Sequence, residues 1–220
     1  RQLGVNPVMY CMGKVMPEPE YEFALDAEGE LAVYALARIS GEGADRTMVA
    51  GDISLSETEI RDILALNKKY DKFVLVLNVG GMVDLEPVID VKNVLLLGQL
   101  GTPTGDVLAD LLLGKSYPSG KLAMTWAPIG KYASTKGFGD MDDTLYTEGI
   151  YVGYRYFDTV HEKPDFPFGY GLSYTDFEMA VKDTVVEAGK ITVTVEVRNT
   201  GTFAGKEVVQ IYYSAPAEKL

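Results

Sequence analysis

The chain has 220 residues, 47% of them hydrophobic and 24% charged, so it is long enough to bury a core in one or two domains. Its formal net charge of −12 argues against a nucleic-acid partner, because binding to a phosphate backbone needs a basic surface. No apolar run approaches the roughly 20 residues of a membrane-spanning helix, so no membrane is expected as a partner.

The first predicted element is a buried strand over 32–39, and the loop after it carries candidate chemistry. Glu42 stands between two glycines in this loop, and Asp45 and Arg46 follow. In open α/β sheets, ligands bind at the carboxyl ends of the strands, and glycine lets a ligand approach the backbone closely. A Gly-Glu-Gly taken alone is more often an inert surface loop, so the weight of Glu42 depends on the rest of the chain.

The next segments alternate between helix and strand. Ser56 and Glu59 form a capping box, and apolar residues at helical spacing follow it. Continuous apolar runs are typical of strands buried on both faces of a parallel sheet. In chain order, the pattern predicts a helix from Ser56 to about Tyr70, a strand over 73–79, a short helical segment near 84–89, a strand over 93–97 and a helix over 106–113 ended by Gly114. This alternation predicts an α/β layered fold with a mostly parallel sheet, and Trp126, at the end of a further strand pattern, is expected in its core.

The character of the sequence changes after residue 127. Residues 128–175 are rich in aromatic residues and glycine and show little periodicity, which indicates a segment packed over other surfaces. From Phe177 the period drops to two, and strands are predicted over 191–197 and 208–213. The 176–220 segment is short of the about 100 residues of a complete β-sandwich, so the chain is expected to stop within that domain and to leave an apolar face open. The expected domains are 1–127, 128–175 and 176–220.

Taken together and in this order, these segments resemble the second and third domains of glycoside hydrolase family 3, the β-glucosidase-like enzymes. Residues 199–210 are similar to part of the fibronectin-III-like domain of that family, which makes 176–220 an incomplete antiparallel β-sandwich. The other segments that carry the resemblance are 40–46, 51–59, 109–115, 117–122, 150–157 and 168–175.

The resemblance implies a mechanism with retention of configuration and two carboxylates. In the family the nucleophile is an Asp on a (β/α)8 barrel, and the general acid/base is commonly a Glu of the α/β sandwich. Carried over by motif, the acid/base would be Glu42. The motif of the nucleophile is not found here, so the barrel is expected outside this chain, before or after it. The expected function is that of a fragment of an exo-acting β-glycosidase, a β-glucosidase, with a β-linked glucoside or oligosaccharide as substrate.

Asp45 and Arg46 allow two interpretations. They could form a local ion pair that orders the loop, or they could contact the sugar directly. The loops after the 73–79 and 93–97 strands differ from those expected in many relatives, which leaves sugar and linkage open.

No cofactor and no metal are expected. A single cysteine, Cys11, excludes an internal disulfide and a thiolate metal cage, and the single His161, in a turn-like stretch, excludes a histidine-rich zinc site. Acid–base chemistry is therefore left to carboxylates. The compartment stays open between the cytoplasm and the periplasm or exterior of a bacterial cell, as does homo-oligomerisation.

Two alternatives belong to other classes of function. The chain could be a non-catalytic carbohydrate-binding or scaffold module derived from the same family. It could also be a flavodoxin-like nucleotide binder, although neither a G-x-G-x-x-G nor a Walker A motif is present.

Overall fold

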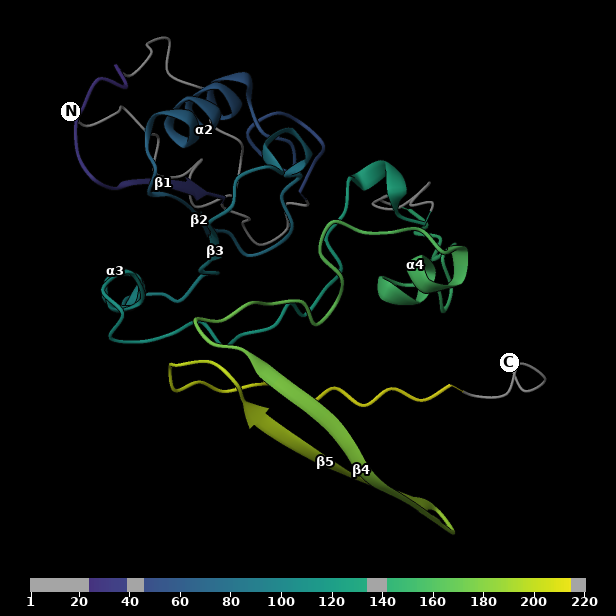
Figure 1. Ribbon diagram of the computed structural model, residues 1–220. Helices are drawn as coiled ribbons and strands as arrows, with labels where there is room; N and C mark the ends of the chain where they lie inside the picture. Colours follow the sequence, from purple (N-terminus) through teal and green to yellow (C-terminus); the bar gives the residue numbers. More distant parts are fainter. Residues whose placement is uncertain (1–23, 39–45, 134–141, 215–220) are drawn as a thin grey trace.

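The described residues form a parallel sheet and an antiparallel hairpin (Figure 1). The computed structural model describes residues 24–38, 46–133 and 142–214. Strands β1 (Ala32–Ala37), β2 (Phe73–Asn78) and β3 (Val94–Leu96) are parallel and stand in the order β1-β2-β3. The central β2 pairs through Leu75 with Tyr34 on one side and Val94 on the other. The predicted α/β fold with a parallel sheet is confirmed.

Two helices cover opposite faces of β2, because successive strand side chains point to opposite sides. Leu75 and Leu77 share a buried cluster with Ile63 of helix α2 (Glu57–Lys69). Val76, between them in the strand, packs instead with Leu111 of helix α3 (Thr104–Leu112). Figure 1 shows the sheet between these two helices. The prediction of a strand buried on both faces is correct for β2.

Both helices begin and end close to the predicted places. Ser56 Oγ accepts a hydrogen bond from the Glu59 amide at 3.1 Å, and the Glu59 carboxylate accepts one from the Ser56 amide at 2.9 Å, which confirms the capping box. At Gly114 the backbone takes φ +69°, a left-handed conformation that glycine adopts without strain, and α3 ends. A short 3-10 helix, η1 (Glu86–Val88), occupies the predicted helical segment between β2 and β3.

Strand β3 departs from the expectation of burial on both faces. Val94 and Leu96 are 37% and 42% exposed, whereas Leu95 and Leu97 pack against the α3 cluster. Within the part of the chain that the structure describes, β3 is one of the two edge strands of the sheet, and only the face toward α3 is covered. An apolar run alone does not distinguish a central strand from an edge strand.

The aromatic segment packs onto the α/β layer mainly through extended chain. Trp126 and Phe166 exchange backbone hydrogen bonds of 2.8 and 3.0 Å, and Trp126 is buried, as predicted. Two short helices, η2 (Ile129–Lys131) and α4 (Tyr154–Val160), were not predicted. His161 ends α4 with φ 57° and is exposed, within the stretch predicted to be turn-like.

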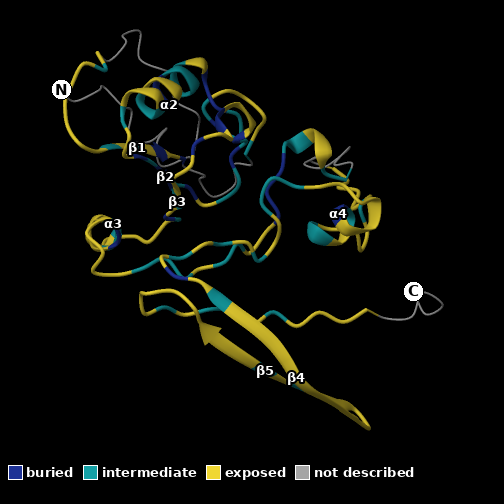
Figure 2. Cartoon of the chain, viewed as in Figure 1, coloured by how far each residue is buried: buried dark blue, intermediate teal, exposed yellow. Residues whose placement is uncertain are grey.

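Strands β4 (Phe177–Glu187) and β5 (Lys190–Asn199) form an antiparallel hairpin, and its side chains are largely exposed (Figure 2). The predicted third strand over 208–213 is wrong, because this segment joins neither sheet. Side chains hold it instead: the Gln210 amide donates to the Gly169 carbonyl at 3.2 Å, and the Tyr212 ring packs against Tyr154. Among the helices of the described ranges, none has the length and apolar character needed to cross a membrane.

Candidate active site

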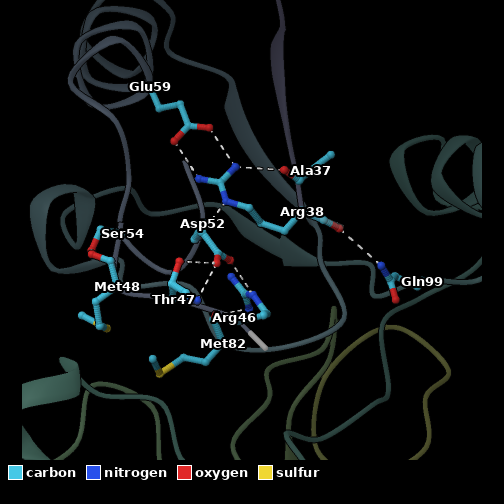
Figure 3. A network of polar contacts seen from close by, with 10 residues as sticks. All are labelled: Ala37, Arg38, Arg46, Thr47, Met48, Asp52, Ser54, Glu59, Met82 and Gln99. Atoms are coloured by element: carbon cyan, nitrogen blue, oxygen red, sulfur yellow. Dashed lines mark hydrogen bonds and ion pairs between the residues drawn. The ribbon is translucent and has the colours of Figure 1, made fainter. Parts of the chain in front are cut away.

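The carboxyl ends of the three parallel strands meet at one edge of the sheet, where α/β proteins place their sites. Arg38 follows β1, Met82 follows β2 and Gln99 follows β3. The Gln99 amide donates to the Arg38 carbonyl at 3.3 Å, and Arg46 donates to the Met82 carbonyl at 2.6 Å. The three loops are therefore in direct contact (Figure 3).

Gly80 makes part of this contact possible. A Cβ atom at that position would lie 2.5 Å from the Gln99 Oε1 atom, so a larger residue would push the Gln99 side chain away. The loop after β2, one of the two expected to differ from many relatives, thus lies beside the candidate site.

Arg38 carries a buried charge that is fully engaged. The residue is 7% exposed, and its guanidinium donates to both Glu59 carboxylate oxygens at 2.8 and 2.7 Å. Such a two-bond pair is needed here, because an unpaired buried charge is strongly unfavourable. Since Glu59 also closes the capping box with Ser56, one carboxylate joins the end of β1 to the start of α2.

Asp52 organises the other half of the polar network. It is 6% exposed, and its carboxylate accepts hydrogen bonds from Arg46 Nε at 2.8 Å and from the Thr47 amide at 2.6 Å. Its backbone carbonyl accepts a third hydrogen bond, from Arg38 Nε at 2.6 Å (Figure 3). The Nη2 atom of Arg46 is buried and has no hydrogen-bond partner among the described residues.

This network lies at the two ends of segment 39–45, the segment that contains two of the three predicted site residues. Glu42 and Asp45 lie outside the described residues, so their predicted roles stay predictions. Arg46 is described, and the ion pair it forms there is with Asp52. The predicted Asp45–Arg46 pair and the predicted contact of Arg46 with a sugar both stay predictions.

From the sequence, Glu59 was predicted only as part of a capping box, and the network that Asp52 and Glu59 form with Arg38 was not predicted. A usable signal was present: a charged residue at the end of a strand expected to be buried must find a partner. Which partner it finds, 14 or 21 residues along the chain, cannot be deduced from spacing.

A second group of charges lies around Lys131. Burial raises the pKa of Asp165. The positive charge of Lys131 lowers this pKa in part, and the negative charge of Asp84 raises it further. Lys131 also forms an ion pair of 3.0 Å with Glu162, and both side chains are more than 40% exposed. We interpret this group as a surface contact between η2 and the chain after α4. Across the described ranges, no cluster of three or more His, Cys, Asp or Glu side chains could hold a metal ion.

A groove of about 970 Å³ runs beside β3, between α3 and the chain around Lys121 and Tyr170. Its lining is mostly apolar and, among the described residues, includes lysines but no carboxylate. It therefore offers no acid–base pair, and the carboxyl edge of the sheet remains the candidate site.

Comparison with known proteins places this architecture in a family. Residues 20–174 match the profile of the glycosyl hydrolase family 3 C-terminal domain. Beta-glucosidase A of Butyrivibrio fibrisolvens is 38% identical, over 100% of this chain and 32% of its own length. Thermostable beta-glucosidase B of Acetivibrio thermocellus is 42% identical over 78% of this chain and 23% of its own length.

Solved structures agree in fold. Beta-glucosidase 3B from Thermotoga neapolitana, in complex with alpha-D-glucose, superposes with a TM-score of 0.75 at 36% identity, over 79% of this chain and 26% of that chain. A beta-glucosidase from Paenibacillus barengoltzii gives the same TM-score of 0.75 at 38% identity, over 80% of this chain and 20% of that chain. The present chain therefore spans about a third or less of the length of these relatives.

Proposed function

The chain belongs to glycosyl hydrolase family 3, and we propose that it supplies the general acid/base of a retaining β-glucosidase, with Glu42 as that residue. The observation that carries the proposal is the position of Glu42 in the chain. It lies in a glycine-flanked segment whose two ends, Arg38 and Arg46, are held at the carboxyl edge of a parallel sheet.

The chemistry needs a second carboxylate. Retaining hydrolysis uses two carboxyl groups about 5–5.5 Å apart, one to attack the sugar and one to protonate the leaving oxygen. We assign the nucleophile to an Asp on a (β/α)8 domain that these 220 residues do not include. The chain by itself is then expected to hydrolyse no glycoside.

Glu42 would have to keep its proton near neutral pH to act as an acid. Partial desolvation and the negative charge of the nucleophile both favour the protonated form of a carboxyl group. A site shared between two domains supplies both conditions, and domain interfaces are common places for small-molecule sites.

Glucose is the sugar we propose, as the terminal β-linked residue of a glucoside or oligosaccharide. The support is that several relatives are named β-glucosidases and that the Thermotoga neapolitana protein was solved with alpha-D-glucose. Arg46, which has one buried donor atom without a partner among the described residues, is the residue that we propose for a polar contact with the substrate.

The test compares Glu42→Ala with wild type in a polypeptide that joins these residues to a (β/α)8 domain, on aryl β-glucosides with good and poor leaving groups. Loss of a general acid/base is expected to lower kcat/KM, which reports formation of the glycosyl-enzyme, about 10²–10⁴-fold for poor leaving groups and much less for good ones. It should also lower kcat for the good ones, because hydrolysis of the glycosyl-enzyme loses its base. Added azide should restore turnover of the good substrates and yield the β-glucosyl azide, because azide attacks the glycosyl-enzyme without needing a base.

Glu28→Ala is the matched control, since Glu28 is exposed and precedes the amino end of β1. It should leave all rates unchanged. Equal rates for Glu42→Ala and wild type would contradict the proposed role of Glu42. A wild type that binds glucosides but hydrolyses none would favour the non-catalytic carbohydrate-binding module.

A further inference from the structure

We propose that the groove beside β3 binds a neutral oligosaccharide, a chain of β-linked glucose; the choice of glucose rests on the proposed function. The groove has a volume of about 970 Å³, which lies within the range of about 300–1,000 Å³ that is usual for small-molecule sites. Strand β3 and helix α3 form one wall, and the extended segments 116–122 and 166–174 form the other. Figure 1 shows these two segments between the α/β layer and the hairpin.

Two tyrosine rings of the groove lining are held in place by their neighbours. Tyr174 is 45% exposed, and its hydroxyl donates to the Leu111 carbonyl of α3 at 3.2 Å. Tyr170 packs against Phe166 with ring centroids 5.3 Å apart, and its carbonyl accepts a hydrogen bond from the Leu122 amide at 2.8 Å. Rings that are already positioned lose little conformational freedom when a ligand binds. They offer flat apolar surfaces on which the apolar faces of glucose rings can pack.

Strand β3 supplies hydrogen-bonding groups for the hydroxyls of a sugar. The Leu97 amide donates to the Leu77 carbonyl of β2 at 2.9 Å. Because the backbone groups of successive strand residues point to opposite sides, the amides and carbonyls of Val94 and Leu96 point away from β2. Among the described strands, none pairs with β3 on this side. These donors and acceptors are therefore available to a ligand that lies along the groove.

The charges around the groove favour a neutral ligand over an acidic one. Lys121 Nζ forms an ion pair of 2.8 Å with Glu207 and donates to the Gly171 carbonyl at 2.5 Å, so its charge is already compensated. Lys92, the other lysine of the described lining, is exposed, and its charge is screened by water and salt. The described lining contains no carboxylate, although the chain has a net charge of −12. An acidic ligand would find no buried cation without a partner there, whereas a neutral sugar needs none.

A neutral extended peptide could use the same backbone groups, but β3 is a poor template for one. The strand has three residues, and very short edge strands hinder pairing with another chain. The groove also reaches the candidate site, because its lining includes Gly98 and Leu100, the two neighbours of Gln99. Gln99 donates to the Arg38 carbonyl at the carboxyl edge of the sheet. This continuity favours a ligand with the same chemistry as the proposed substrate.

The test titrates cellotetraose, a short chain of β-linked glucose, into the full 220-residue chain and measures the Kd by calorimetry. Tyr174→Ala removes one of the two rings and should raise the Kd about 10-fold. Tyr151→Ala is the matched control, because Tyr151 is 46% exposed and does not line the groove. It should leave the Kd unchanged, and circular dichroism checks that both variants fold. Absence of binding to the folded wild type, or equal losses at the two tyrosines, would overturn the inference.

Leu96→Glu provides a second route if Tyr174→Ala does not fold. A bound sugar would remove water from the new carboxylate, so the Kd should rise about 10-fold or more. Leu64→Glu in α2 is the matched control, because Leu64 is 41% exposed, against 42% for Leu96, and lies outside the groove. Analytical ultracentrifugation of the same proteins tests whether a second copy of the chain occupies the groove. A wild-type dimer that Leu96→Glu converts to a monomer would overturn the inference.

The (β/α)8 domain is the remaining candidate occupant of the groove. Affinity electrophoresis of the polypeptide that includes this domain, in gels that contain soluble β-glucan, tests it. Tyr174→Ala should be retarded less than wild type, and Tyr151→Ala as much as wild type. Equal retardation of all three proteins would show that the other domain covers the groove, and would overturn the inference.

Glu42→Ala separates this inference from the proposed function. Binding in the groove does not need Glu42, so this variant should bind cellotetraose as tightly as wild type. If Glu42→Ala abolishes binding and Tyr174→Ala does not weaken it, the sugar binds at the candidate active site; the inference then fails and the proposed function gains support. If Glu42→Ala shows no leaving-group pattern but Tyr174→Ala still weakens binding, the proposed function fails and the inference stands, as expected of a non-catalytic carbohydrate-binding module.

Discussion

The α/β layer and the β4–β5 hairpin both contain strands with several valines, but the two regions differ in burial. Val76 in β2 is 1% exposed, because α3 covers its face of the sheet. Val186 in β4 is 72% exposed, although it pairs across the hairpin with Ile191 (Figure 2). Strand pairing therefore satisfies the backbone in both regions, but among the described residues only the α/β layer encloses a hydrophobic core. Burial of apolar surface, rather than hydrogen bonding between strands, therefore decides which region contributes more to the free energy of unfolding.

The largest effect expected from this comparison comes from the same substitution placed in each region. Val76→Ala removes two buried carbon atoms and leaves a cavity, so it should lower the free energy of unfolding by about 2 kcal/mol. Val186→Ala should lower it by less than about 0.5 kcal/mol, because the side chain already faces solvent. Urea unfolding of the full chain, followed by circular dichroism, measures both.

Equal losses at the two valines would mean that the hairpin face is covered in solution, and the comparison would then fail. A change in the slope of the unfolding transition, rather than in its midpoint, would indicate that the two regions unfold separately.

A smaller effect is expected at the amino end of α2, where the Glu59 carboxylate binds Arg38. Ser56→Ala removes the hydroxyl that accepts from the Glu59 amide and should cost about 1 kcal/mol. Ser116→Ala, at an exposed position just after α3, is the control and should change the unfolding midpoint little. A neutral result at Ser56 would show that Arg38, through Glu59, holds the start of α2 without help from the cap.

The sequence allowed the local features to be predicted and missed the long-range ones. The capping box at Ser56 could be predicted because it depends on a residue only three positions away. The buried strand β2 could be predicted because its sequence is a continuous apolar run. The 208–213 segment is rich in the valine, isoleucine and tyrosine typical of strands, yet composition does not show whether a partner strand is available. Helix α4 is short and rich in aromatic residues, which have modest helix propensity, so it gave no periodic signal.

The candidate site shows the same difference between local features, which can be predicted, and long-range contacts, which cannot. Glu42 was predicted from its glycine-flanked motif and from the resemblance to the family, and it stays a prediction because it lies outside the described residues. The contacts of Arg38 and Asp52 were not found, because they join residues that only the fold brings together.

The smallest effect concerns the contact that ties the chain after the hairpin to the rest of the protein. Glu207 forms an ion pair of 2.8 Å with Lys121, and the two side chains are 13% and 15% exposed. Burial raises the pKa of Glu207, but hydrogen bonds from Lys121 and the Val208 amide, together with the Lys121 charge, lower it more, so the pKa lies below its usual value. A carboxylate with a lowered pKa stabilises the folded chain above its unfolded pKa of about 4.3, and this contribution is lost as the pH falls through the folded value.

Glu207→Gln should therefore lower the free energy of unfolding by up to about 1 kcal/mol at pH 7, and the difference from wild type should shrink below about pH 4. Glu196→Gln is the matched control within the hairpin, because the Lys182–Glu196 pair spans a similar 3.0 Å but is 51% and 59% exposed. Thermal unfolding at both pH values measures the two variants.

If Glu207→Gln has the small, nearly pH-independent effect expected of Glu196→Gln, the Lys121–Glu207 ion pair does not help to hold the chain after the hairpin against the rest of the protein. The attachment would then depend on the Gln210 and Tyr212 contacts, and the hairpin would be even less coupled to the α/β layer than its exposure implies.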